Sequence, residues 1–187
     1  MKFFSFQRSF WIKSIVVIVI AVAGTFISCE KLDELTKFDM SYESSVTIPG
    51  TLGIDTPFEV ATPDITTNSD QEFSGENTSK DNVQEIILKE LTLDLQSPSD
   101  SDFSFLKSLT LYIDADGLEK LKIASKSSIP DDVGQTIEMS TTSKDLKEYI
   151  FKDKFNISVE VTTDEMISED HEVLVSSVYQ VDATLVN

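Results

Sequence analysis

Apolar and polar residues alternate with a period of two over most of the chain beyond residue 37. From Phe38 to Ile48 the even positions are mostly apolar and the odd positions mostly polar. A similar alternation runs through residues 109–115, 155–161 and 173–185. Successive side chains of a strand point to opposite faces, so this period predicts long strands that each bury one face against a core.

Shorter strands and turns are predicted between these segments. Asp116-Gly117 favours a tight turn that joins residues 109–115 to Leu121–Ile123 as a hairpin. Phe58–Val60 lies between two prolines, which favours a short edge strand, and residues 135–140 predict a further short strand. These elements extend the β-pattern over most of the segment 38–187.

One strand is predicted to contain a bulge. Its apolar face is formed by four residues: Ile87, Leu91, Leu93 and Leu95. Lys89 interrupts this face with a polar side chain, and an extra residue in the strand would shift the phase at that point. The sequence therefore predicts a strand over residues 87–95 with a bulge at Lys89.

Two segments lack the period of two. Residues 66–82 are polar apart from Phe73 and are predicted to form a long loop. Thr142 and Asp145 resemble a capping box at the start of a helix. The apolar face of that helix comprises Leu146, Tyr149 and Ile150. We expect two helical turns across one end of the sheets.

These elements together predict an all-β fold. Seven or eight strands with turns between them and one short helix favour an antiparallel two-sheet β-sandwich of immunoglobulin-like architecture. A parallel α/β fold would need crossover helices between strands, which the pattern lacks. Trp11 is the only tryptophan and precedes the strands, so the Cys–Trp–Cys core of immunoglobulin domains is absent.

Residues 1–28 have the layout of a secretory signal. Residues 2–13 carry three basic and no acidic side chains, residues 15–23 are uninterruptedly apolar, and Ser28-Cys29 follows. Three interpretations remain open: a lipoprotein signal ending at Cys29, cleavage after Ala23, or an uncleaved anchor. Cys29 is the only cysteine, so no disulfide can form within the chain, and its position favours the first interpretation.

The residues around Cys29 carry a resemblance to a known class of proteins. Phe26-Ile27-Ser28-Cys29 resembles the lipobox of signal peptidase II, with Phe26 where leucine is usual. The run 30–34 is similar to the lysine-plus-acidic surface signal of Bacteroidota lipoproteins, although Leu32 interrupts it. The chain thus resembles small outer-membrane lipoproteins of the Bacteroidota, which share no catalytic motif. The resemblance covers residues 1–34.

This resemblance implies an organisation and a location. Residues 1–28 would be the signal peptide, 29–37 a tether and 38–187 the β-sandwich domain. Cys29 would carry the lipid, and the domain would lie at the outer membrane, either surface-exposed or facing the periplasm. A spacer of charged residues would look the same as an export signal, so both faces of that membrane stay open.

Charge excludes one class of partner. Residues 29–187 contain 12 basic and 33 acidic side chains, a net charge of −21. Nucleic-acid binding needs lysine and arginine clusters that displace counterions from phosphates, and no such run follows Lys13. We therefore expect no nucleic-acid partner, and a membrane contact through the lipid only.

No residues predict catalysis or a bound metal. The single histidine, His171, is predicted to be a solvated turn residue, and no partner lies at metal-ligand or nucleophile spacing. Residues 99–102 and 114–119 place oxygen donors on turns, which calcium could use, although turn formation alone explains both. We expect no catalytic residue, no metal site and no cofactor.

Binding is the function that remains. We expect a non-enzymatic structural or binding module, for example an accessory subunit of an envelope complex, with an unidentified protein or glycan partner. The alternative is a carbohydrate-binding surface lipoprotein. Three aromatic residues could stack on sugars in that case: Phe103, Phe105 and Tyr112. A small hydrolase is the third hypothesis.

Overall fold

The computed structural model describes residues 36–50 and 54–184. The chain divides into two compact units, Met1–Lys37 and Phe38–Asn187. The predicted signal at 1–28 and the lipidation residue Cys29 lie outside the described residues, as does most of the predicted tether. Within the part of the chain that is described, no helix has the length and apolar character to span a bilayer.

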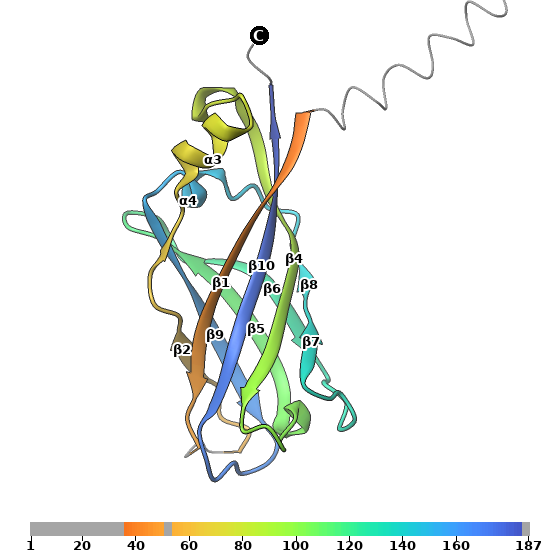
Figure 1. Cartoon of the computed structure of the whole chain (residues 1–187). Coiled ribbons are helices and arrows are strands. Elements are labelled where there is room, and N and C mark those ends of the chain that lie inside the picture. The colour runs from red at the N-terminus through yellow and green to blue at the C-terminus, as the bar shows by residue number, and fades with distance from the viewer. Residues whose placement is uncertain (1–35, 51–53, 185–187) are drawn as a thin grey trace, which may run out of the picture. The chain divides into compact units, whose positions relative to one another are not determined.

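The second unit is a sandwich of two sheets (Figure 1). The four-stranded sheet has the order β1-β10-β4-β7. Its strands are β1 (Lys37–Ile48), β10 (His171–Ala183), β4 (Val83–Ser97) and β7 (Thr136–Glu138). β10 and β4 are antiparallel, and Val175 lies opposite Leu93. The two longest strands therefore form the centre of this sheet.

The second sheet has the order β2-β9-β5-β6-β8, and β3 also pairs with β9. Its strands are β2 (Phe58–Ala61), β3 (Ile65–Thr66), β9 (Lys154–Thr163), β5 (Leu106–Asp114), β6 (Leu121–Ser127) and β8 (Ser140–Thr141). Neighbouring strands in it are antiparallel. The predicted antiparallel sandwich, the hairpin into 121–123 and the edge strand predicted at 58–60 are confirmed.

The core consists of the inward faces that the alternation predicted. The odd positions of β10 from Val173 to Ala183 are buried, as are those of β9 from Phe155 to Val161. β5 contributes Leu109, Leu111 and Ile113. A buried aliphatic side chain contributes about 1.5–3 kcal/mol through removal from water, so these rows hold the two sheets together.

β4 has the predicted bulge but a different buried face. The register with β10 shifts between Val178 and Tyr179, which lie opposite Glu90 and Leu88. Leu91, Leu93 and Leu95 are buried after the shift, whereas Ile86 and Leu88 are buried before it. Ile87 is only half-buried, so its predicted inward orientation is wrong. The extra residue at the bulge moves the core face from even positions before it to odd positions after it.

Helical structure replaces the loop that was predicted at residues 66–82. Residues 66–82 contain α3 (Ser69–Gly75) and the 3₁₀ turn η2 (Lys80–Asn82). The predicted loop is wrong because the buried Phe73 packs edge-to-face on Phe38 and Phe151, which anchors α3. A further 3₁₀ turn, η3, spans Phe103–Phe105.

The predicted helix at 146–150 is present but shorter than expected. α4 is one turn, Lys147–Ile150. Its start is stabilised by Asp145, whose Oδ1 accepts from the backbone N–H of Lys147 at 3.0 Å and of Ile86 at 3.1 Å. Thr142 has a different contact, to the Lys122 carbonyl at 3.5 Å. Asp145, which precedes the N-cap residue Leu146, therefore supports the start of α4 without Thr142.

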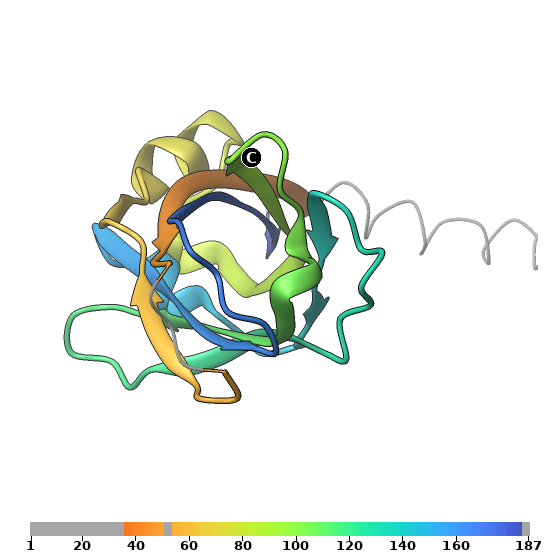
Figure 2. The ribbon, with the colours of Figure 1, turned by 90° about the horizontal axis from the view of Figure 1, so that it is seen from below.

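The sandwich has two distinct ends (Figures 1 and 2). β1 begins at one end, where α3, α4 and the end of β10 also lie. Four loops gather at the opposite end: β1–β2, β4–β5, β6–β7 and β9–β10. We call them the far-end loops; their described residues are 49–50 with 54–57, 98–105, 128–135 and 164–170.

Candidate functional site

His171 is a buried structural residue, so its prediction as a solvated turn residue is wrong. Its side chain is 3% exposed, and its ring lies 4.5 Å from that of Phe105. Nδ1 lies 3.0 Å from the carbonyl oxygen of Glu169 and Nε2 lies 2.9 Å from Ser101 Oγ. A carbonyl only accepts, so Nδ1 donates, and a neutral ring then accepts from Ser101.

These contacts use both ring nitrogens of His171 within the fold. They join the β9–β10 loop, which carries Glu169, to the β4–β5 loop, which carries Ser101. The sequence did contain a signal for this burial, since His171 is in phase with Val173 and Val175 on the inward face of β10. A general acid or base must reach the substrate proton, and this ring points into the fold.

The three aromatic residues considered for sugar stacking form no platform. Phe103 and Phe105 are 0% and 4% exposed, so they belong to the core. Tyr112 faces outward on β5 and is half-buried, and Lys120 Nζ lies 4.7 Å from its ring centroid. Lys120 also forms an ion pair with Glu59, and this hydrogen bond lowers the pKa of the Glu59 carboxyl. The face of Tyr112 is therefore covered by an ammonium group.

The oxygen-rich turns are explained by their own hydrogen bonds. Asp102 Oδ1 accepts from the backbone N–H of Ser104 at 2.9 Å, and the contacts with Ser104 lower the pKa of the Asp102 carboxyl. Gly117, with φ of 74°, lies in the turn of the β5–β6 hairpin, where glycine is favoured. Among residues 36–50 and 54–184, no group of three His, Cys, Asp or Glu side chains is placed to hold a metal ion.

A hollow of about 450 Å³ lies beside the β4 bulge. It is lined by Lys89, Glu90, Leu91, Thr92, Glu138 and Met139. The chain leaves β7 at Glu138 for β8 in the other sheet, and the Met139 N–H donates to the Leu91 carbonyl at 2.9 Å. Lys89 is paired with Asp39 at 2.6 Å. The hollow is therefore a consequence of the bulge and of the crossing between sheets.

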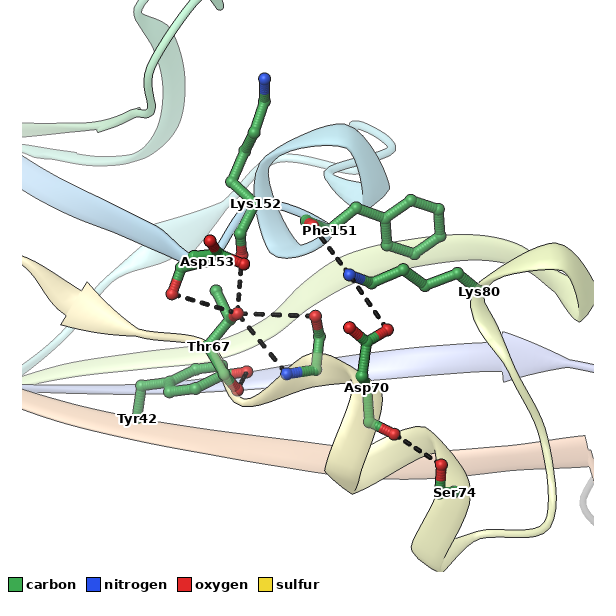
Figure 3. Close-up of polar contacts among 9 residues, drawn as sticks. Tyr42, Thr67, Asp70, Ser74, Lys80, Phe151, Lys152 and Asp153 are labelled. Atoms are coloured by element: carbon green, nitrogen blue, oxygen red, sulfur yellow. Dashed lines mark hydrogen bonds and ion pairs between the residues drawn. The ribbon is translucent and has the colours of Figure 1, made fainter.

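A second hollow, of about 280 Å³, lies at the start of α3 (Figure 3). Thr67 Oγ1 donates to the Lys152 carbonyl at 2.6 Å, and the Thr67 carbonyl accepts from Tyr42 at 2.8 Å. Lys80 donates to the Phe151 carbonyl at 2.9 Å and pairs with Asp70 at 3.1 Å. These contacts attach α3 to the turn between α4 and β9.

No protein-family model matches the sequence, and no curated protein does. The solved structures that are distantly similar to the chain include the following three. Recombinant N-glycanase F (PNGase F) is 11% identical with a TM-score of 0.43, over 78% of this chain and 42% of that one. The module CpGH89CBM32-5 from Clostridium perfringens was solved with GalNAc-beta-1,3-galactose. It is 9% identical with a TM-score of 0.34, over 78% of this chain and 97% of that one.

The third is CBM32-3 from a family 31 glycoside hydrolase of Clostridium perfringens. It is 8% identical with a TM-score of 0.30, over 81% of this chain and 78% of that one. The chain spans about two fifths of the length of the glycanase. With TM-scores below 0.5, these likenesses identify neither a family nor a ligand.

Proposed function

We propose that this protein is a lipid-anchored component of the bacterial outer membrane whose β-sandwich acts as a non-enzymatic structural or binding module. Cys29 would carry the lipid, and residues 29–37 would form the tether. The sequence supports this proposal through the order of residues 1–29, in which a basic segment precedes an apolar one and Ser28-Cys29 follows.

The observation that carries the proposal is where the chain enters the sandwich. β1 begins at Lys37, eight residues after Cys29, at the end opposite the far-end loops. Eight extended residues span at most about 30 Å. The 12 residues of β1 rise a further distance of roughly 40 Å. A lipid at Cys29 would thus keep the start of β1 within about 30 Å of the lipid anchor, while the far-end loops lie at the other end of the strand.

The absence of catalysis is part of the proposal and has structural support. His171 is buried, with both ring nitrogens bonded inside the fold. Carbohydrate binding, the alternative from the sequence, would be favoured by a cluster of exposed aromatic rings. Phe103 and Phe105 are buried and Lys120 covers Tyr112, so these residues favour a module that binds by other contacts.

Replacement of the anchor residue tests the proposal. Full-length wild type, Cys29→Ala and the control Met166→Ser would be expressed in a bacterium with lipoprotein processing, and membranes would be washed with carbonate. Met166 is exposed at the far end, so its replacement leaves anchoring intact. We expect wild type and M166S in the washed membranes and C29A either released or unprocessed. A C29A protein that is processed and partitions like wild type would contradict the lipid anchor.

A further inference from the structure

Two large apolar side chains are exposed at the far end of the sandwich. Ile54 in the β1–β2 loop is 47% exposed, and Met166 in the β9–β10 loop is 78% exposed. Within residues 36–50 and 54–184 they are the only large hydrophobic side chains in the exposed class. Exposed apolar residues scattered singly over a surface need no explanation. These two belong to neighbouring loops at the same end of the sandwich.

The structure holds these two loops together. The Asp55 N–H donates to the Thr163 carbonyl at 2.8 Å, next to Ile54 and three residues before Met166. The Gly50 N–H donates to Asp170 Oδ1 at 2.9 Å. A Cβ on Gly50 would lie 2.5 Å from the backbone of Glu169, so the loops approach as closely as glycine permits. The two apolar side chains therefore project from one joined pair of loops.

The charged side chains of the far-end loops all carry the same sign. The described residues of the far-end loops contain nine acidic side chains and no lysine or arginine. The acidic residues are Asp55, Asp100, Asp102, Asp131, Asp132, Asp164, Glu165, Glu169 and Asp170. Lys107 on β5 neutralises Asp55 at 2.5 Å. The remaining eight carboxylates form no ion pair within the described part of the chain, which leaves an acidic rim.

We propose that this far-end surface docks a second protein, which presents an apolar patch surrounded by lysine and arginine. Ile54 and Met166 supply the apolar contact, and the acidic rim supplies charge complementarity and fast association. A second copy of this chain would bring like charges together, and an anionic lipid or nucleic-acid surface would be repelled as well. The inference deepens the proposed function and rests on it, since it names the partner of the module.

Site-specific photo-crosslinking in cells that naturally express the protein tests this docking. A photoreactive residue replaces Met166 in the full chain, and the matched control carries it at the exposed Gln71 on α3, at the opposite end. We expect a protein adduct from position 166 and none from position 71. Mass spectrometry then identifies the partner, which is purified for binding to the soluble sandwich attached to its native tether.

The purified partner distinguishes specific docking from chance capture. Ile54→Ser with Met166→Ser should weaken its affinity by about tenfold or more, as loss of central apolar contacts does. Raising NaCl from roughly 0.05 to 0.5 M should slow association several-fold, because salt screens the acidic rim. Thermal unfolding should be unchanged in the double variant, since both residues are exposed.

Four results would overturn the docking proposal: no adduct at position 166, equal adducts at 166 and 71, an adduct with a second copy or with lipid, and an acidic partner surface. An affinity that is insensitive to both the double variant and salt would overturn it equally. Carbonate-washed membranes from the same cells report separately on anchoring. Loss of docking with Cys29-dependent attachment intact counts against this inference alone.

Discussion

The hydroxyl group of Tyr179 gives the sharpest test of the core. Tyr179 is 0% exposed, and its hydroxyl has no hydrogen-bond partner of acceptable geometry among the described residues. Its neighbour Tyr42, with ring centroids 5.7 Å apart, donates to the Thr67 carbonyl at 2.8 Å. Ser177, which is also close to Tyr179, donates its hydroxyl to the Tyr42 carbonyl at 3.3 Å. The two tyrosines form a matched pair, one with a partner and one without.

The expected free-energy changes have opposite signs. A hydroxyl buried without a hydrogen bond costs about 1–3 kcal/mol by mutational measurements. Tyr179→Phe removes that cost and leaves a void of one oxygen, so we expect the free energy of unfolding to stay level or rise by up to about 2 kcal/mol. Tyr42→Phe deletes the hydrogen bond to the Thr67 carbonyl and should lower the free energy of unfolding by about 0.5–1.5 kcal/mol.

Urea denaturation of the sandwich with its tether, followed by circular dichroism, measures both values. The slope of the transition should be the same in all three proteins, because the surface exposed on unfolding does not change. A loss of more than about 1 kcal/mol in Y179F would refute the reasoning. It would mean that the Tyr179 hydroxyl is bonded in the folded state, for example to a buried water.

Two further predictions concern the backbone and alkaline pH. Gly50→Ala should lower the free energy of unfolding by about 1–3 kcal/mol, since its Cβ would lie 2.5 Å from the Glu169 backbone. A Cβ on Gly75, at the end of α3, would have no neighbouring atom within 4 Å, so Gly75→Ala should be neutral or stabilising by up to about 1 kcal/mol. Equal changes in the free energy of unfolding for the two variants would contradict this account. Burial raises the pKa of Tyr42 and Tyr179 above 10. Above about pH 10 the unfolded chain therefore loses these protons before the folded chain does. The free energy of unfolding, measured with urea, should fall there by up to ~1.4 kcal/mol per pH unit for each tyrosine, and less steeply in Y179F. A free energy of unfolding that stays constant up to pH 11 would contradict this prediction.

The period-two pattern was sufficient for the strands but not for their irregularities. β1, β5, β9 and β10 bury the faces that alternation predicted, because no inserted residue shifts the phase within the predicted stretches. A register shift in β5, between Leu106 and Ser108, precedes its predicted stretch. In β4 the pattern revealed the bulge at Lys89 but not which side of the bulge changes face. Both faces of the stretch Ile86-Ile87-Leu88 are apolar, so the sequence does not show which face is buried. The register with β10 determines it.

Tertiary contacts account for the other differences. α3 forms in a polar segment because Phe73 finds Phe38 and Phe151, which are distant in sequence. His171 is buried because Ser101 and the Glu169 carbonyl satisfy its nitrogens, and neither partner follows from a motif. Ile54 and Met166 could have been noted as apolar residues in the segments between predicted strands. Their position at one end depends on the fold.

The central claim is that Cys29 attaches the sandwich to a membrane. Mass spectrometry of the protein purified from its native membranes tests it most directly, because the three interpretations of the segment 1–28 give different N-termini. We predict a mature chain that begins at Cys29 and carries acyl chains on that residue. An unmodified chain that begins at Gly24, or an intact chain that begins at Met1, would contradict the account.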